Sequence, residues 1–435
     1  MNAMLRTRLF SVLVLMTMSQ ASAADFALRD GDTVVFLGDS LTAARSYGKM
    51  VENYTLLRFP QRKMRFINAG IGGDTAAGGL KRIERDVFAH KATVLIVAFG
   101  TNDIGWGVCA DDEHKQTYLN AVKGIVTECR RRDVRVYICS AAVTGADPEK
   151  SEESFLQKMC DEGMALSKSL DGDAIDVQRT MCEIQKRVVL SNANIKDSTK
   201  HNTMHLADGT HLNELGQFAM AYAILKGLNA PAEVSSATLN AADAKVIAAT
   251  GCSVTDVTRA EGRLEFTRLD EGLPFNDGIF FALHFRFVPA PAELNQYLLT
   301  VKHLPEGRYD LTVDGRAVGT FAAKHLADGL NIASHTANGW EPGGPWNTQA
   351  NVLLSLTNAR HELATAGLLA NLHTKQGNFA EHLSRQSTPA NEQLEALQRS
   401  AATVSVLHRS REEGVSRSPR SQHLVSSPPK SIVGH

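Results

Sequence analysis

Thr33-Val-Val-Phe-Leu-Gly-Asp-Ser-Leu-Thr42 is the stretch that decides the fold. Its apolar first half, Thr33–Leu37, predicts a β-strand that Gly38 ends. The residues that follow predict a tight turn into a helix that opens at Ser40. A serine at the carboxyl end of such a strand has an exposed hydroxyl, and its backbone N–H faces a ligand at the helix N-terminus. A serine in this position is also a common N-cap with no further role.

The same strand–helix pattern continues on both sides of the turn as far as Gly227. Thr93–Phe99 has the nearly continuous apolar character of a strand buried on both faces. Further strands are expected at Met64–Asn68, Val134–Cys139 and Asp173–Val177, and helices near Tyr47–Arg58, Glu113–Arg132 and Leu212–Leu225. This alternation predicts a flavodoxin-like, doubly wound parallel α/β sheet with helices on both faces. Ligands of such sheets bind at the carboxyl ends of the strands.

Three more segments are expected at that edge of the sheet. Asn68–Thr75 follows the second strand, and its glycines let the backbone approach a ligand closely. Phe99–Asp103 closes the third strand with an asparagine that can donate into the crevice or cap its own turn. Leu206–Asn213 precedes the last helix. It holds Asp208 and His211 three positions apart, so the carboxylate can bind Nδ1–H and direct Nε2 outward.

Together these four segments resemble the SGNH hydrolase family, also called GDSL lipases and esterases. The family's four marker residues match Ser40 in Gly-Asp-Ser-Leu, Gly73 in Gly-Gly-Asp-Thr, Asn102 in Gly-Thr-Asn-Asp and His211 in Asp-Gly-Thr-His. All four occur in the family's order. The resemblance covers roughly residues 32–227, which is less than half of the chain.

The resemblance implies a catalytic triad in which Ser40 is the nucleophile, His211 the general base and acid, and Asp208 the residue that orients the histidine. It implies an oxyanion hole made of the Ser40 and Gly73 backbone N–H groups and the Asn102 side-chain amide. This set is chemically sufficient, because a serine hydroxyl needs only a neighbouring base for activation and donors for the developing charge. No cofactor and no metal are expected.

Other candidate residues are given no role in the chemistry. Asp39 and Asp103 are expected only to brace the turns in which they lie. His361-Glu362 begins like a zinc-protease motif, but Thr365 stands where that motif needs a second histidine.

The pattern changes after Ala230-Pro231, so we expect the catalytic domain to occupy residues 24–231. Period-two alternation predicts a β-rich region over 232–345, and the Asp314-Gly315 pair predicts a hairpin within it. The strands expected there are Gly262–Phe266, Phe281–Phe287, Tyr297–Val301 and Tyr309–Phe321.

A helical extension is expected over 346–406, and the Ser-, Arg- and Pro-rich composition of 407–435 predicts a disordered tail. The region after residue 232 could be a binding or dimerisation module. The favoured interpretation is a buttress packed on the catalytic domain.

The N-terminus predicts export. Arg6 and Arg8 precede the apolar run Leu9–Met18, and Ala21-Ser-Ala23 provides a cleavage site, so residues 1–23 are expected to be a secretory signal. The apolar run is shorter than the ~20 residues that span a bilayer, so we expect a periplasmic or extracellular protein without a stable membrane anchor. The sequence leaves open the oligomeric state and the pairing of the six cysteines.

Composition and net charge argue against one class of function, nucleic-acid binding. In a chain of 435 residues, 43% hydrophobic and 21% charged residues are typical of globular protein, and a net charge of -1 gives no electrostatic footprint for a nucleic-acid partner. We expect an esterase that removes short acyl groups, such as acetyl, from a small-molecule or polysaccharide ester, with carbohydrate the favoured substrate. The alternatives are a GDSL-type lipase or lysophospholipase, and a non-catalytic carbohydrate-binding surface protein. The non-catalytic alternative is disfavoured because the candidate catalytic residues are intact.

Overall fold

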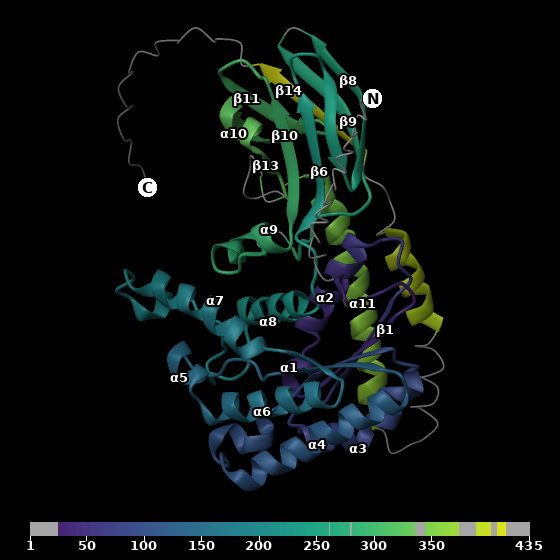
Figure 1. Cartoon of the computed structure of the whole chain (residues 1–435), viewed down its shortest axis with the longest axis vertical. Helices are drawn as coiled ribbons and strands as arrows, with labels where there is room; N and C mark the ends of the chain where they lie inside the picture. The colour runs from purple at the N-terminus through teal and green to yellow at the C-terminus, as the bar shows by residue number, and fades with distance from the viewer. Residues whose placement is uncertain are drawn as a thin grey trace, which may run out of the picture.

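The computed structural model describes residues 25–260, 262–278, 281–333, 335, 344–373, 389–401 and 407–414. The expected signal sequence lies outside these ranges. The described chain is elongated, with an α/β part at one end and a part built from β-sheets at the other (Figure 1). Among the described residues, no helix is both long and apolar enough to cross a membrane.

The α/β part confirms the predicted fold class. Its five strands lie in the order β2-β1-β3-β4-β5, and all pair in parallel. They are β1 (Thr33–Gly38), β2 (Arg65–Gly70), β3 (Val94–Ala98), β4 (Arg135–Cys139) and β5 (Asp173–Ile175). The strand order reverses next to β1, so the carboxyl end of β1 lies at the topological switch point, where such folds bind ligands.

Strand residues alternate between two apolar cores, which fixes the helices on both faces of the sheet. Val34 and Phe36 of β1 pack with α2, α7 and α8, while Val35 and Leu37 pack with α3, α4 and α6. The helices of this part are α1 (Ser40–Ala43), α2 (Ser46–Arg58), α3 (Ala76–Asp86), α4 (Asp112–Arg131), α5 (Pro148–Glu152), α6 (Phe155–Ser169), α7 (Val177–Asn192) and α8 (Glu214–Gly227), with 3-10 turns at η1 (Phe88–His90), η2 (Asn102–Gly107) and η3 (Ser198–Lys200).

Two further sheets form the other end of the molecule. A four-stranded sheet has the order β13-β10-β6-β7, and a five-stranded sheet has the order β12-β11-β14-β9-β8. Their strands are β6 (Glu233–Asn240), β7 (Lys245–Thr250), β8 (Cys252–Ala260), β9 (Arg263–Asp270), β10 (Gln296–Lys302), β11 (Arg308–Val313), β12 (Arg316–Ala322), β13 (Leu330–Asn331) and β14 (Leu407–Gly414). Short helices α9 (Ala290–Glu293) and α10 (Ala323–Asp328) connect some of them.

The predicted hairpin is present, since β11 and β12 are antiparallel and Asp314 and Gly315 both have positive φ. The strand predicted at Phe281–Phe287 is wrong: Phe281–Arg286 forms a 3-10 helix, η4. Its aromatic side chains pack on α8, with ring centroids of Phe281 and Phe218 4.4 Å apart. Contact with this helix outweighs the strand-like alternation.

The tail prediction is wrong for residues 407–414, because they form β14. This strand lies between β9 and β11 and pairs antiparallel with both. Pairing on both edges can order a segment that has little apolar content of its own. The rest of the predicted tail, 415–435, lies outside the described residues.

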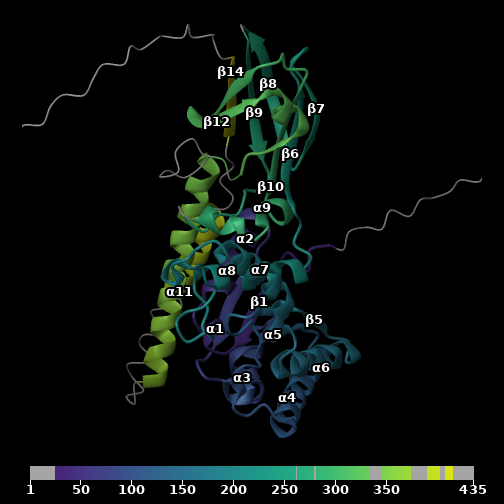
Figure 2. The same cartoon turned by 90° about the vertical axis from the view of Figure 1, so that its left-hand side faces the viewer.

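The helical extension begins with α11 (Pro345–His373), which runs along the α/β part (Figure 2). Arg360 of α11 donates to both carboxylate oxygens of Glu52 in α2, and His361 Nε2 lies 2.9 Å from Glu52 Oε2. All three side chains are buried. Gln398, from a second helix over 389–401, also donates to Glu52. The contacts are those expected of a buttress.

Candidate active site

Four loops carry the predicted site residues to the carboxyl edge of the α/β sheet. Ser40 opens α1 directly after β1, Gly73 lies in the loop after β2, and Asn102 opens η2 after β3. Asp208 and His211 lie on the loop that precedes α8. An isolated bridge between His205 and Leu212 ties the two sides of that loop together.

The structure brings Ser40, His211 and Asp208 into one hydrogen-bonded chain. His211 Nε2 lies 3.0 Å from Ser40 Oγ, and His211 Nδ1 lies 2.7 Å from Asp208 Oδ2. The other carboxylate oxygen, Asp208 Oδ1, accepts hydrogen bonds from the backbone N–H groups of Thr210 and His211. A three-residue turn therefore fixes the carboxylate relative to the imidazole.

Asp208 is ionised at neutral pH and fixes the tautomer of His211. The backbone hydrogen bond from Thr210 and the contacts with His211 lower the pKa of Asp208 to about 2. An ionised carboxylate can only accept, so Nδ1 of a neutral His211 carries the proton. The unprotonated Nε2 then faces the Ser40 hydroxyl, as required for a base that activates a nucleophile.

The three expected oxyanion donors lie on neighbouring loops. Within the described residues, no protein acceptor takes a hydrogen bond from the Ser40 or Gly73 backbone N–H. Gly73 has φ 75°, a left-handed conformation that glycine adopts without strain. Asn102 Nδ2 donates to the Asp74 backbone carbonyl at 3.0 Å, and its Oδ1 accepts from Trp106 Nε1 at 2.8 Å. One N–H of the Asn102 amide remains for a ligand.

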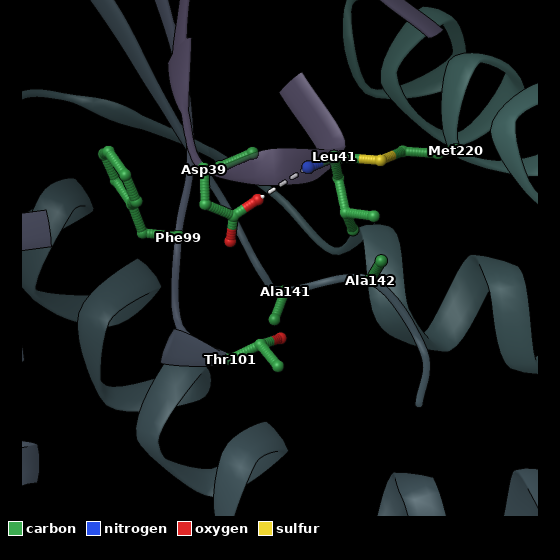
Figure 3. A pocket seen from close by; sticks show the side chains of 8 residues that line it. Asp39, Leu41, Phe99, Thr101, Ala141, Ala142 and Met220 are labelled. Atoms are coloured by element: carbon green, nitrogen blue, oxygen red, sulfur yellow. Dashed lines mark hydrogen bonds between the residues drawn. The ribbon is translucent and has the colours of Figure 1, made fainter. Parts of the chain in front are cut away.

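Asp39 and Asp103 brace the turns around the site, as expected. Asp39 Oδ1 accepts from the Leu41 N–H at the start of α1, and Asp103 Oδ1 accepts from the Ala76 N–H at the start of α3. Figure 3 shows the Asp39 carboxylate facing a cavity of about 10 Å³, roughly the space of one water molecule. Desolvation by burial raises the pKa of both Asp39 and Asp103 to about 6.

A pocket of about 280 Å³ lies beside the histidine. Its walls come from η2, from Thr144, from the start of α6 and from Thr210, the residue before His211. None of its lining residues is charged: they are Thr101, Ile104, Trp106, Gly107, Ala110, Thr144, Ser154, Phe155, Leu156 and Thr210. The wall combines hydroxyl-bearing and apolar residues, which suits an uncharged group with some polar atoms.

Residues 36–218 match the GDSL-like Lipase/Acylhydrolase family. We refer to residues 36–218, the part of the chain that is similar to this family, as the GDSL-like domain. A segment of 81 residues is 36% identical to the uncharacterized lipoprotein YqeF of Bacillus subtilis strain 168. That match covers 17% of this chain and 33% of YqeF, so the chain spans about a third of that relative's length.

A solved structure of low sequence identity shares the architecture of this chain. BT4096, a gut microbial diltiazem-metabolizing enzyme, has a TM-score of 0.75 with 21% identity, over 89% of this chain and 98% of its own. This likeness extends beyond the GDSL-like domain into the sheets that follow it. Axe2, an acetylxylan esterase from Geobacillus stearothermophilus, has a TM-score of 0.40 with 17% identity, over 46% of this chain and 96% of its own.

Two side chains at the edge of the GDSL-like domain's site were not singled out from the sequence. Arg82 donates to Asp74 and to the Gly38 and Ala69 carbonyls, and so links the loops after β1 and β2. Trp106 contacts both Asn102 and His211. The only sequence signal for Trp106 is that it is an aromatic residue between two glycines, four positions after Asn102.

Proposed function

We propose that the protein is an exported serine esterase that hydrolyses carboxylic esters through an acyl-enzyme. In this proposal Ser40 is the nucleophile, His211 the general base and acid, and Asp208 the residue that orients His211. The observation that carries the proposal is the chain of hydrogen bonds from Ser40 Oγ through the imidazole to an ionised carboxylate.

The reaction follows from these contacts. Ser40 Oγ attacks the ester carbonyl carbon while its proton passes to His211 Nε2. The negative charge on the carbonyl oxygen is stabilised by the Ser40 and Gly73 N–H groups and the remaining Asn102 N–H. The bond to the alcohol oxygen then breaks as Nε2 returns the proton to it. Water attacks the acyl-serine with the same base and releases the carboxylic acid.

The pocket beside His211 supports a small, uncharged substrate group. Its hydroxyl-bearing residues can pair with sugar hydroxyls, and Trp106 offers an aromatic edge or face. We therefore propose that the substrate is a short-chain ester, such as an acetyl ester, of a carbohydrate. The sequence of residues 1–23 supports export to the periplasm or the medium.

The first test is a Ser40→Ala variant of the purified mature protein. Losing the nucleophile of a triad lowers turnover by on the order of 10⁴- to 10⁶-fold, while the fold is expected to stay intact because the Ser40 side chain is not in the core. Hydrolysis of p-nitrophenyl acetate and the melting curve are measured together. More than a few per cent of residual activity with an unchanged melting curve would exclude Ser40 as the nucleophile.

The second test distinguishes substrates. p-Nitrophenyl esters of increasing acyl length are compared with acetylated xylan and acetylated pectin. We expect kcat/KM to fall steeply beyond short acyl chains and acetate to be released from the polysaccharides. Activity that rises with chain length would favour a lipase or lysophospholipase instead.

N-terminal sequencing of the secreted protein tests export and cleavage after Ala23.

A further inference from the structure

The Asn102 amide is held from two sides, and this leaves it a single orientation. Its Oδ1 accepts from the Trp106 indole N–H at 2.8 Å, and its Nδ2 donates to the Asp74 carbonyl at 3.0 Å. Rotating the amide by half a turn would set N–H against N–H and oxygen against oxygen. The two bonds therefore keep one Nδ2 proton available at the position of the proposed oxyanion.

Trp106 is not placed there by core packing. Its side chain is half-exposed, at 50%, and its backbone has φ 59° and ψ 30°. A left-handed conformation is costly for a bulky residue, on the order of 1–3 kcal/mol, and persists only where the surroundings enforce it. Here the Trp106 backbone N–H donates to the Thr101 carbonyl at 2.9 Å. Strain of this kind is concentrated at functional sites.

The same indole also contacts the proposed general base. The Trp106 and His211 rings meet edge to face, with centroids 5.5 Å apart. Trp106 lies in the wall of the pocket as well. One side chain thus touches the proposed oxyanion donor, the proposed base and the space proposed for substrate.

We infer that Trp106 is a positioning residue that orients the Asn102 amide for the oxyanion through its indole N–H. This inference rests on the proposed function. A substrate in the pocket covers the half-exposed indole and excludes water, which strengthens the Trp106–Asn102 hydrogen bond when the charge develops. The effect of Trp106 is therefore expected in turnover more than in substrate affinity.

The test compares Trp106→Phe with Asn102→Ala and with the double variant. Phenylalanine keeps an aromatic ring beside His211 but has no N–H. We expect Asn102→Ala to lower kcat by roughly 10²- to 10³-fold. We expect Trp106→Phe to lower kcat by on the order of 10-fold while KM changes by less than about 3-fold. In the Asn102→Ala background, Trp106→Phe should change kcat by less than about 2-fold, because its target is gone.

Controls separate this role from a structural one. Val108→Ala alters a side chain that is 89% exposed two residues further along, and should change neither kcat nor KM. Melting curves of all variants should match the wild type. An equal loss of kcat from Trp106→Phe with and without Asn102, or a loss confined to KM, would overturn the inference. If Ser40→Ala stayed active, the proposed function itself would fail, whatever the Trp106 variants show.

Discussion

Asp39 should make the protein less stable as the pH rises through the mildly acidic range. Its carboxylate is buried beside the nucleophile, and desolvation raises its pKa from 3.8 to about 6, partly offset by the Leu41 backbone hydrogen bond. The folded state therefore holds the Asp39 proton more tightly than the unfolded state does. Below pH 3.8 both states are protonated and nothing is lost. Between pH 3.8 and 6 stability falls, and above pH 6 the loss is complete.

The magnitude follows from the size of the pKa change. A difference of about 2 pKa units corresponds to about 3 kcal/mol of lost stability at neutral pH. Most of this loss develops as the pH rises from 4 to 7. Asp39→Asn removes this term and keeps an oxygen that can accept from the Leu41 N–H, since asparagine caps helices as well as aspartate does. The unfolding free energy of the variant minus that of the wild type should therefore rise by roughly 2 kcal/mol from pH 4 to pH 7.5.

Urea unfolding at several pH values measures this difference directly. Asp147→Asn is the matched control, because Asp147 also caps a helix, α5, but lies at the surface. Hydrogen bonds from Lys150 lower the pKa of Asp147. The unfolding free energy of Asp147→Asn minus that of the wild type should therefore fall as the pH rises. A pH-independent difference for Asp39→Asn, or one that falls as the pH rises, would refute the argument that burial keeps this carboxyl protonated in mild acid.

Two further predictions concern the segments that follow the GDSL-like domain. Arg360→Met leaves Glu52 buried without its guanidinium partner and should lower the unfolding free energy by about 3–5 kcal/mol. As a control, Lys324→Met in the exposed Lys324–Asp328 pair should change the unfolding free energy by less than about 0.5 kcal/mol. Equal effects of the two variants in urea unfolding would contradict this prediction. Truncation after residue 406 removes β14 and the backbone hydrogen bonds on both of its edges, so we expect a loss on the order of 5 kcal/mol, while truncation after Gly414 should leave the melting curve unchanged. A stable protein lacking β14 would show that the sheet does not need this strand.

The α/β fold and the arrangement of the candidate site residues could be predicted together because both depend on local signals. Each parallel strand is a short apolar run, and its carboxyl end meets those of its neighbours at one edge of the sheet. Motifs after β1, β2 and β3 therefore had to converge. The Asp208–His211 contact spans only three residues, so its geometry also follows from a turn.

What could not be predicted depends on contacts between distant parts of the chain. Glu52 and Arg360 are 308 positions apart, and neither position shows that the other will be buried against it. The β14 sequence is polar and charged, so only the free edges of β9 and β11 explain why it forms a strand. The Trp106–Asn102 bond needs a left-handed residue that the pattern of Asn102–Gly107 does not specify.

The contacts of α11 reach the turn that follows α1, the helix that begins with Ser40. Arg45 lies between α1 and α2 in a left-handed conformation, with φ 60°, and its guanidinium lies 3.4 Å from His361 Nδ1 of α11. His361 in turn contacts Glu52, which lies further along α2. The helix that begins with Ser40 is thus held by its Asp39 cap at one end and by α11 at the corner that follows it.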